Sequence, residues 1–288
     1  ARVEVVFPVD PNYKTGPGGQ SQGQVDADGP GGDDPFEVEI ILAPPHRTAG
    51  ATFFYEIVFQ NESSGAAARS VNVLDSLGPL FDPTTVRFLG VGVDHDYYCS
   101  NGSFGTFTQG NKPYCPGASP YISTTSGSSG SSGSTSSLNE NFRFPLTADI
   151  GFSDIHVNVA CSRVGSDLKW EFTSLTADDN GDLRPIDEDL NADAEAGFLV
   201  THVPNTPIGE AFMQFSVDLA EPVAPDTWIP GTLIKNKASV DFLDINPMGG
   251  GGGGAGAGNP VWSLDTEYAY HLIGRESDWP DGCEFGVD

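Results

Sequence analysis

Apolar and polar residues alternate with a period of two along most of this chain. In the clearest run, 154–161, every second residue from Ile155 to Cys161 is apolar, and His156 and Asn158 fall on the opposite face. Similar runs cover 36–40, 70–74, 168–172, 213–219, 238–242 and 262–272, whereas 52–59 is apolar on both faces, as in a central strand. A period of two is typical of strands with one buried face, and the Gly, Pro, Asn and Asp residues between the runs are typical of turns. The pattern predicts an all-β fold in which antiparallel sheets pack face to face as a β-sandwich.

Two low-complexity tracts interrupt the strand pattern. Residues 123–137 are rich in Ser and Gly, and residues 249–258 are almost entirely Gly and Ala. Closing a longer loop costs only about 0.6 kcal/mol per doubling of its length, so one fold tolerates such insertions. We therefore predict one extended module over 1–288; a domain boundary near residue 135 is the alternative. Its predicted parts are a first strand and linker (1–20), a Cys-containing and Ser/Gly-rich insertion (94–140), a poly-Gly insertion (249–258) and a linker to a next module (274–288).

The charge balance of the chain is strongly acidic. It carries 40 Asp and Glu residues against 13 Lys and Arg, a formal net charge of −27 over 288 residues. Such a surface repels phosphates, so we expect no nucleic-acid partner. No apolar run reaches the roughly 18 residues of a membrane helix, so we expect no membrane insertion.

The cysteines and two glycosylation sequons indicate an extracellular protein. Four cysteines, an even number, suit two disulfides in an oxidising compartment. Of the three possible connectivities we choose Cys99–Cys115 and Cys161–Cys283; the rival is a free, buried Cys161 with Cys283 bonded to a neighbouring chain or module. The sequons at Asn61 and Asn101 predict covalent N-linked glycans.

Several motifs resemble an Ig-like repeat domain of large extracellular surface proteins. Residues 9–19, VDPNYKTGPGG, are similar to the DPN-x-K-x-GP-x-G opening of that family. Further similar stretches follow in the family's order: YEIVFQN (55–61), AARSVNVLD (67–75), WEFTSL (170–175), AGFL (196–199) and IKNKASVDF (234–242). The Cys-containing arm (94–120) and the Gly and Ser tracts depart from the family pattern. These expansions make the chain most similar to an algal mastigoneme-type flagellar filament protein.

The resemblance implies a structural module with no catalytic residues and no cofactor. Its expected partners are neighbouring copies or modules of the same protein in a filament, at the cell or flagellar surface. Pro fixes φ, Asn caps turns and Gly adopts positive φ, so the opening motif has the chemistry of a rigid module junction. The predicted junction residues are Asp10, Pro11, Asn12, Gly16 and Pro17.

One acidic stretch is the best candidate for a ligand site. Its oxygen-bearing side chains alternate as they do in calcium loops: Asp187, Asp189, Asn191, Asp193 and Glu195. The stretch fails the EF-hand template, because Ala192 stands where Gly is required. A solvated acidic loop is therefore the favoured interpretation and Ca²⁺ the alternative. The corresponding alternative function is a calcium-dependent adhesion or carbohydrate-binding module that contacts surface glycans. With no nucleophile-elbow or zinc motif in the chain, we predict that it is not an enzyme.

Overall fold

The computed structural model describes a protein built of strands. It describes residues 13–15, 39–41, 52–61, 67–107, 115, 138–147, 155–177, 181–186, 196–220, 233–243, 260–266 and 269–273. These residues form two large antiparallel sheets packed as a sandwich and a small sheet in which the strands Glu39–Ile41 and Ala269–Ile273 pair in parallel, so the all-β prediction is confirmed. Among them no helix has the length and apolar character needed to cross a bilayer.

The first sheet has six strands, and its central strand is buried on both faces. Their order is β1 (Tyr13–Thr15), β3 (Thr52–Gln60), β12 (Glu210–Leu219), β5 (Phe81–Val93), β6 (Asp96–Cys99) and β7 (Phe104–Thr106). Nearly every side chain of β12 is buried. Because strand side chains point alternately to the two faces, something must cover the outer face of this sheet as well as the inner one.

The second sheet has one buried and one open face. It contains β15 (Pro260–Asp265), β14 (Ala238–Leu243), β4 (Ser70–Ser76), β10 (Asp167–Ala177), β9 (His156–Val164) and β8 (Leu138–Pro145), with β11 (Leu183–Pro185) paired to β10. In β9 the burial alternates residue by residue as the sequence predicts, with Val157, Val159 and Cys161 buried.

A third, small sheet consists of β13 (Leu233–Asn236), β16 (Ala269–Ile273) and β2 (Glu39–Ile41). Only Lys237 separates β13 from β14, so the chain passes there directly from the small sheet into the second sheet. The predicted strand at 262–272 is in fact two strands, β15 and β16, which belong to different sheets.

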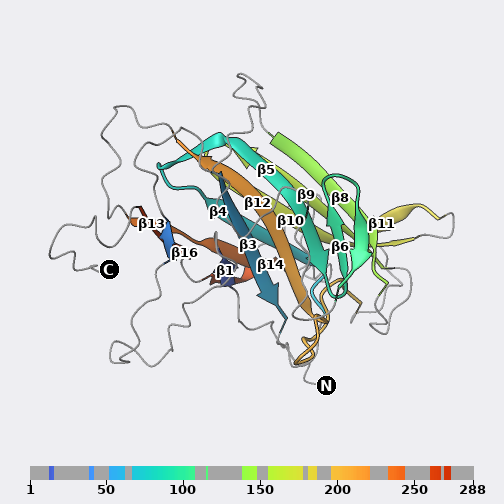
Figure 1. Cartoon of the computed structure of the whole chain (residues 1–288). Helices are drawn as coiled ribbons and strands as arrows, with labels where there is room; N and C mark the ends of the chain where they lie inside the picture. Colours follow the sequence, from blue (N-terminus) through green and yellow to red (C-terminus); the bar gives the residue numbers. More distant parts are fainter. Residues whose placement is uncertain are drawn as a thin grey trace.

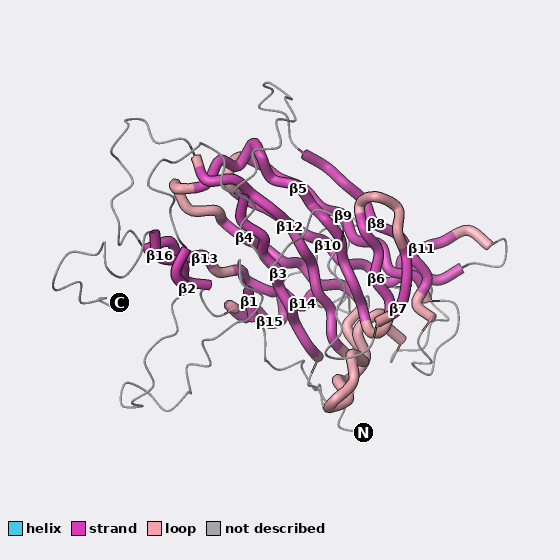
Figure 2. Tube along the Cα trace, in the orientation of Figure 1, coloured by secondary structure: helices cyan, strands magenta, loops and turns pink. Residues whose placement is uncertain are grey.

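The core lies between the two large sheets, which face each other as two layers (Figures 1 and 2). Trp170 on β10 makes an edge contact with Phe88 on β5, with ring centroids 5.3 Å apart. Phe59 on β3 makes a similar contact with Phe172 on β10, at 5.4 Å. Edge-to-face aromatic pairs of this kind add about 0.5–1.5 kcal/mol each beyond their area burial.

Residues from both sides of the Ser/Gly tract share one sheet. Strand β12 follows the tract in sequence and pairs with both β3 and β5, which precede it. The tract itself connects β7 in the first sheet to β8 in the second. Most of the predicted insertion at 94–140 lies outside the described residues, and so do the whole poly-Gly insertion at 249–258 and the whole predicted linker at 274–288.

Candidate functional site

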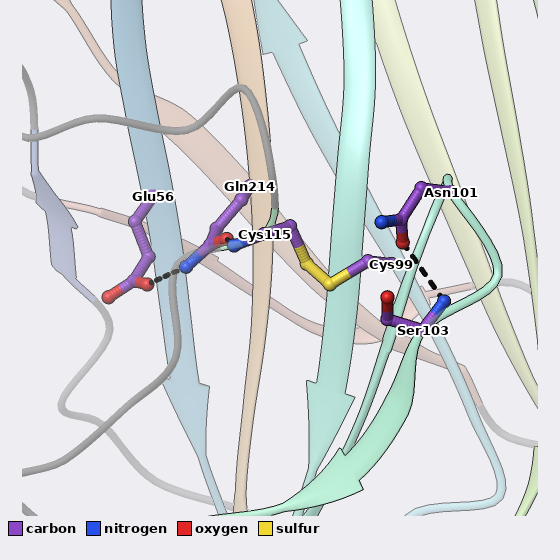
Figure 3. Close-up of a disulfide and its surroundings, with 6 residues drawn as sticks. All are labelled: Glu56, Cys99, Asn101, Ser103, Cys115 and Gln214. Carbon is purple, nitrogen blue, oxygen red and sulfur yellow. Dashed lines mark hydrogen bonds between the residues drawn. A yellow bond between two sulfur atoms is a disulfide. The ribbon is translucent and has the colours of Figure 1, made fainter.

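A disulfide fastens the Cys-containing arm to the outer face of the six-stranded sheet. Cys99, at the end of β6, bonds to Cys115, and both side chains are buried. The backbone N–H of Cys115 donates to Oε1 of Gln214 on β12 (3.0 Å), and Nε2 of Gln214 donates to Glu56 on β3 (2.8 Å; Figure 3). The predicted Cys99–Cys115 disulfide is confirmed.

Two glycines on β5 make room for this arm. A Cβ on Gly90 would lie 2.2 Å from Sγ of Cys115, and one on Gly92 would lie 2.1 Å from the ring of Phe212. Real Cβ contacts are not that short, so any side chain at either position would displace the arm or the phenylalanine. The glycines therefore allow the sheet to be covered closely on its outer face.

Aromatic residues of the arm pack on the chain's own sandwich. Phe107 packs edge-on against Phe212, and Tyr97 packs against the cluster that these two rings form with Val58. Tyr98 points to the inner face, where its ring stacks on that of Phe144 from the second sheet. Phe104 is 43% exposed and also contacts Phe144. These described rings thus serve the module's own packing, and Tyr114 and Tyr121 lie outside the described residues.

The two sequons occupy opposite environments. Asn101 is exposed in the turn between β6 and β7, where its Oδ1 accepts from the backbone N–H of Ser103 (Figure 3). Asn61 is fully buried at the end of β3, and its Nδ2 donates to the carbonyl of Leu199 (2.9 Å). A glycan on Nδ2 of Asn61 would have to displace this hydrogen bond and bring the side chain out to solvent.

The predicted Cys161–Cys283 disulfide is wrong. Cys161 is a free thiol on the inner face of β9, buried in the core between the sheets. A partner could reach it only by entering that core. Burial raises the pKa of the Cys161 thiol well above its ordinary value, and the carboxylate of Glu140 on β8 raises it further. The rival interpretation of a free, buried Cys161 is therefore confirmed; Cys283 lies outside the described residues.

Two buried carboxyl groups lie at one end of the sandwich, on either side of His95. Asp96 accepts hydrogen bonds from Thr147, at 2.5 Å from its backbone N–H and 2.6 Å from its hydroxyl. Because Thr147 follows β8, these bonds tie the two sheets together. Asp94 accepts from the backbone N–H of Gly209 at 2.7 Å, and burial raises its pKa to about 7.

The loop before β12 is fastened at the same end of the sandwich. Asn61 donates through its backbone N–H to the carbonyl of Gly209 (2.9 Å), and its own carbonyl accepts from His202 (2.6 Å). With the side-chain bond to Leu199, Asn61 thus contacts this loop at three points. Asn61 and Asp94 together hold the loop against β3 and the β5–β6 turn.

The sequence pattern does not single out Asp94 or Asp96. Among the described acidic residues they are set apart by burial, which they share with Asp75 and Glu210, and tertiary packing sets that burial. A weak signal is present: the segment Asp94-His95-Asp96 directly follows the apolar residues Val91 and Val93. A polar turn between strands explains that pattern equally well.

The predicted calcium ligands and junction residues lie outside the described residues. This holds for Asp187, Asp189, Asn191, Asp193 and Glu195, and for Asp10, Pro11, Asn12, Gly16 and Pro17. Within the described ranges, no three His, Cys, Asp or Glu side chains are grouped so that they could hold a metal ion.

The described polar contacts thus fasten loops and sheets to one another. Comparison of the chain with protein-family models, with curated proteins and with solved structures found no match, so its resemblance to the Ig-like repeat family stays a prediction.

Proposed function

We propose that this chain is a structural building block of an extracellular filament or cell-surface appendage, similar to a mastigoneme. In this proposal it is an Ig-like module that acts through contacts between copies. The observation that carries the proposal is the use of its buried polar groups: Asp96 joins the two sheets, Asn61 fastens the loop before β12, and Gln214 fastens the arm. Cross-ties of this kind stiffen a module that has to transmit force.

The open face of the second sheet supports contacts between copies. Small and polar residues line up across its strands, in the rows Asn139–Ser162–Lys169–Leu74–Ser239–Asp265 and Asn141–Ala160–Glu171–Asn72–Asp241–Ser263. These two rows carry one positive and three negative side chains, in a chain whose net charge is −27. The face thus shares the acidic excess of the chain, and contacts between copies there depend on salt or divalent cations to screen the repulsion.

Electron microscopy of the purified chain, concentrated in physiological salt, tests the proposal. We expect regular fibres or ordered oligomers, promoted by salt because screening weakens the repulsion between acidic copies. Exclusively monomeric particles at every salt and Ca²⁺ concentration would contradict the proposal. A parallel calorimetric titration with Ca²⁺ tests the alternative of calcium-dependent adhesion, for which saturable binding is expected.

A matched pair of surface variants tests the role of the open face. Leu74 lies on it and is 37% exposed, whereas Val203, in the loop before β12, belongs to no strand of this sheet and is 43% exposed. Leu74→Arg should abolish assembly and Val203→Arg should leave it unchanged, although both variants add one positive charge at an exposed apolar residue. Equal effects of the two variants would exclude this face as the contact between copies.

A further inference from the structure

Asp94 has an unusual environment for a carboxyl group. It occupies the two-residue turn between β5 and β6 with a positive φ of 53° and is completely buried. Its Oδ1 accepts from the N–H of Gly209, and its own N–H donates to the carbonyl of Glu210. Its Oδ2 has no hydrogen-bond partner among the described residues. An ionised carboxylate with one bare oxygen is costly to bury.

The charged groups around Asp94 add to this cost. Asp96, on β6, repels a negative charge on Asp94. In the same turn, Nδ1 of His95 lies 3.3 Å from the carbonyl of Phe107. From the loop before β12, Nδ1 of His202 lies 3.0 Å from the carbonyl of Ile208, and Glu210 accepts from Gln60. Each of these three side chains has a polar partner of its own, and the described residues place no Lys or Arg in contact with Asp94.

We propose that Asp94 is a proton-operated clasp: its protonated carboxyl holds the loop 201–209 against the β5–β6 turn, and its ionisation loosens that loop. The proposal is independent of the structural role proposed above. The clasp joins segments 115 residues apart in sequence, through the single side-chain bond to Gly209. Asn61 holds the same loop through groups that do not ionise, so it forms the part of the attachment that pH does not change.

The direction of the pH effect follows from the pKa of Asp94. Burial raises it from 3.8 to about 7; the Gly209 hydrogen bond lowers it and Asp96 raises it. When the loop opens, the carboxyl reaches water and its pKa returns toward 3.8. The closed state therefore binds the proton more tightly than the open one. The free energy of loop closure becomes less favourable as pH rises from about 4 to about 7. Outside that window, the titration of Asp94 does not change it.

Hydrogen exchange of the full chain, followed by mass spectrometry on peptides covering 199–210, tests the clasp. After correction for the intrinsic exchange rate, the opening constant should rise about tenfold per pH unit between pH 5 and 6.5. It should level off above about pH 7, for a total rise on the order of 100-fold from pH 5 to 8. Asp94→Asn keeps the Oδ1 acceptor and tolerates positive φ, and its opening constant should stay flat over this range.

Two further variants make the test decisive. Asn61→Ala should raise the opening constant at every pH and keep the wild-type pH slope. Asp96→Asn removes the like charge beside Asp94, so the plateau should begin at lower pH. Equal pH slopes in wild type and Asp94→Asn, or a slope abolished by Asn61→Ala, would overturn the proposal. If Asp94→Asn does not fold, the Asp96→Asn profile decides: a plateau at lower pH supports the clasp, and an unshifted plateau overturns it.

Discussion

Replacing both arm cysteines, as Cys99→Ala/Cys115→Ala, should lower the free energy of unfolding by at least about 3 kcal/mol. The disulfide joins residues separated by 16 positions. For a closed loop of that size, the chain-entropy relation gives about 3 kcal/mol at 25 °C, because the cross-link restricts the unfolded chain. The folded state adds to this loss: Sγ of Cys115 fills the space beside Gly90, and removing it leaves a void at a buried site.

Urea unfolding followed by tryptophan fluorescence measures this loss, because Trp170 is completely buried in the folded core. The m value should increase, since an unfolded chain without the cross-link exposes more surface. Cys161→Ala is the matched control. It removes a buried sulfur from the core without removing a cross-link, and it should cost roughly 1 kcal/mol with an unchanged m value.

Two results would refute the reasoning. One is a loss below about 1 kcal/mol in the double variant, far under the chain-entropy value. The other is a loss equal to that of Cys161→Ala at the wild-type m value. Either would mean that the bridge does not constrain the unfolded chain and that Gln214 and the apolar cover alone hold the arm.

Three further predictions concern single positions. Peptide mass spectrometry of the native glycoprotein should find glycan on Asn101 and not on Asn61, since only Asn101 is exposed; an occupied Asn61 would contradict the burial of its amide. The thiol of Cys161 should resist iodoacetamide in the folded protein and react after unfolding, because burial raises its pKa and blocks access. Gly92→Ala should cost about 1–3 kcal/mol in urea unfolding through overpacking, whereas Gly78→Ala, which meets no atom within 4 Å, should cost less.

The alternation of side chains predicted strands well where it was regular. It placed β9 and β10 correctly, with Val159 and Trp170 facing the core. It missed β5, the longest strand, because Pro83, Gly90 and Gly92 interrupt its apolar pattern. Those glycines look like turn residues in the sequence, but they are needed because the arm and Phe212 pack directly on them. Strands β6 and β7 were missed for a related reason: they lie in a Gly-rich segment that reads as a loop.

The local order of residues was thus sufficient to predict the class of fold. Whether a strand side chain faces the core depends on whether its position along that strand is odd or even. The local order also made Cys99–Cys115 the preferred disulfide, since a short loop separates the two residues. The special sites depended on contacts between distant segments. Asp94 meets a loop 115 residues away, and Asn61 one 138 residues away. An aspartate in a turn or an asparagine in a sequon is ordinarily a solvated group; only the packing of those segments removed water from these two and gave each its hydrogen-bond partner.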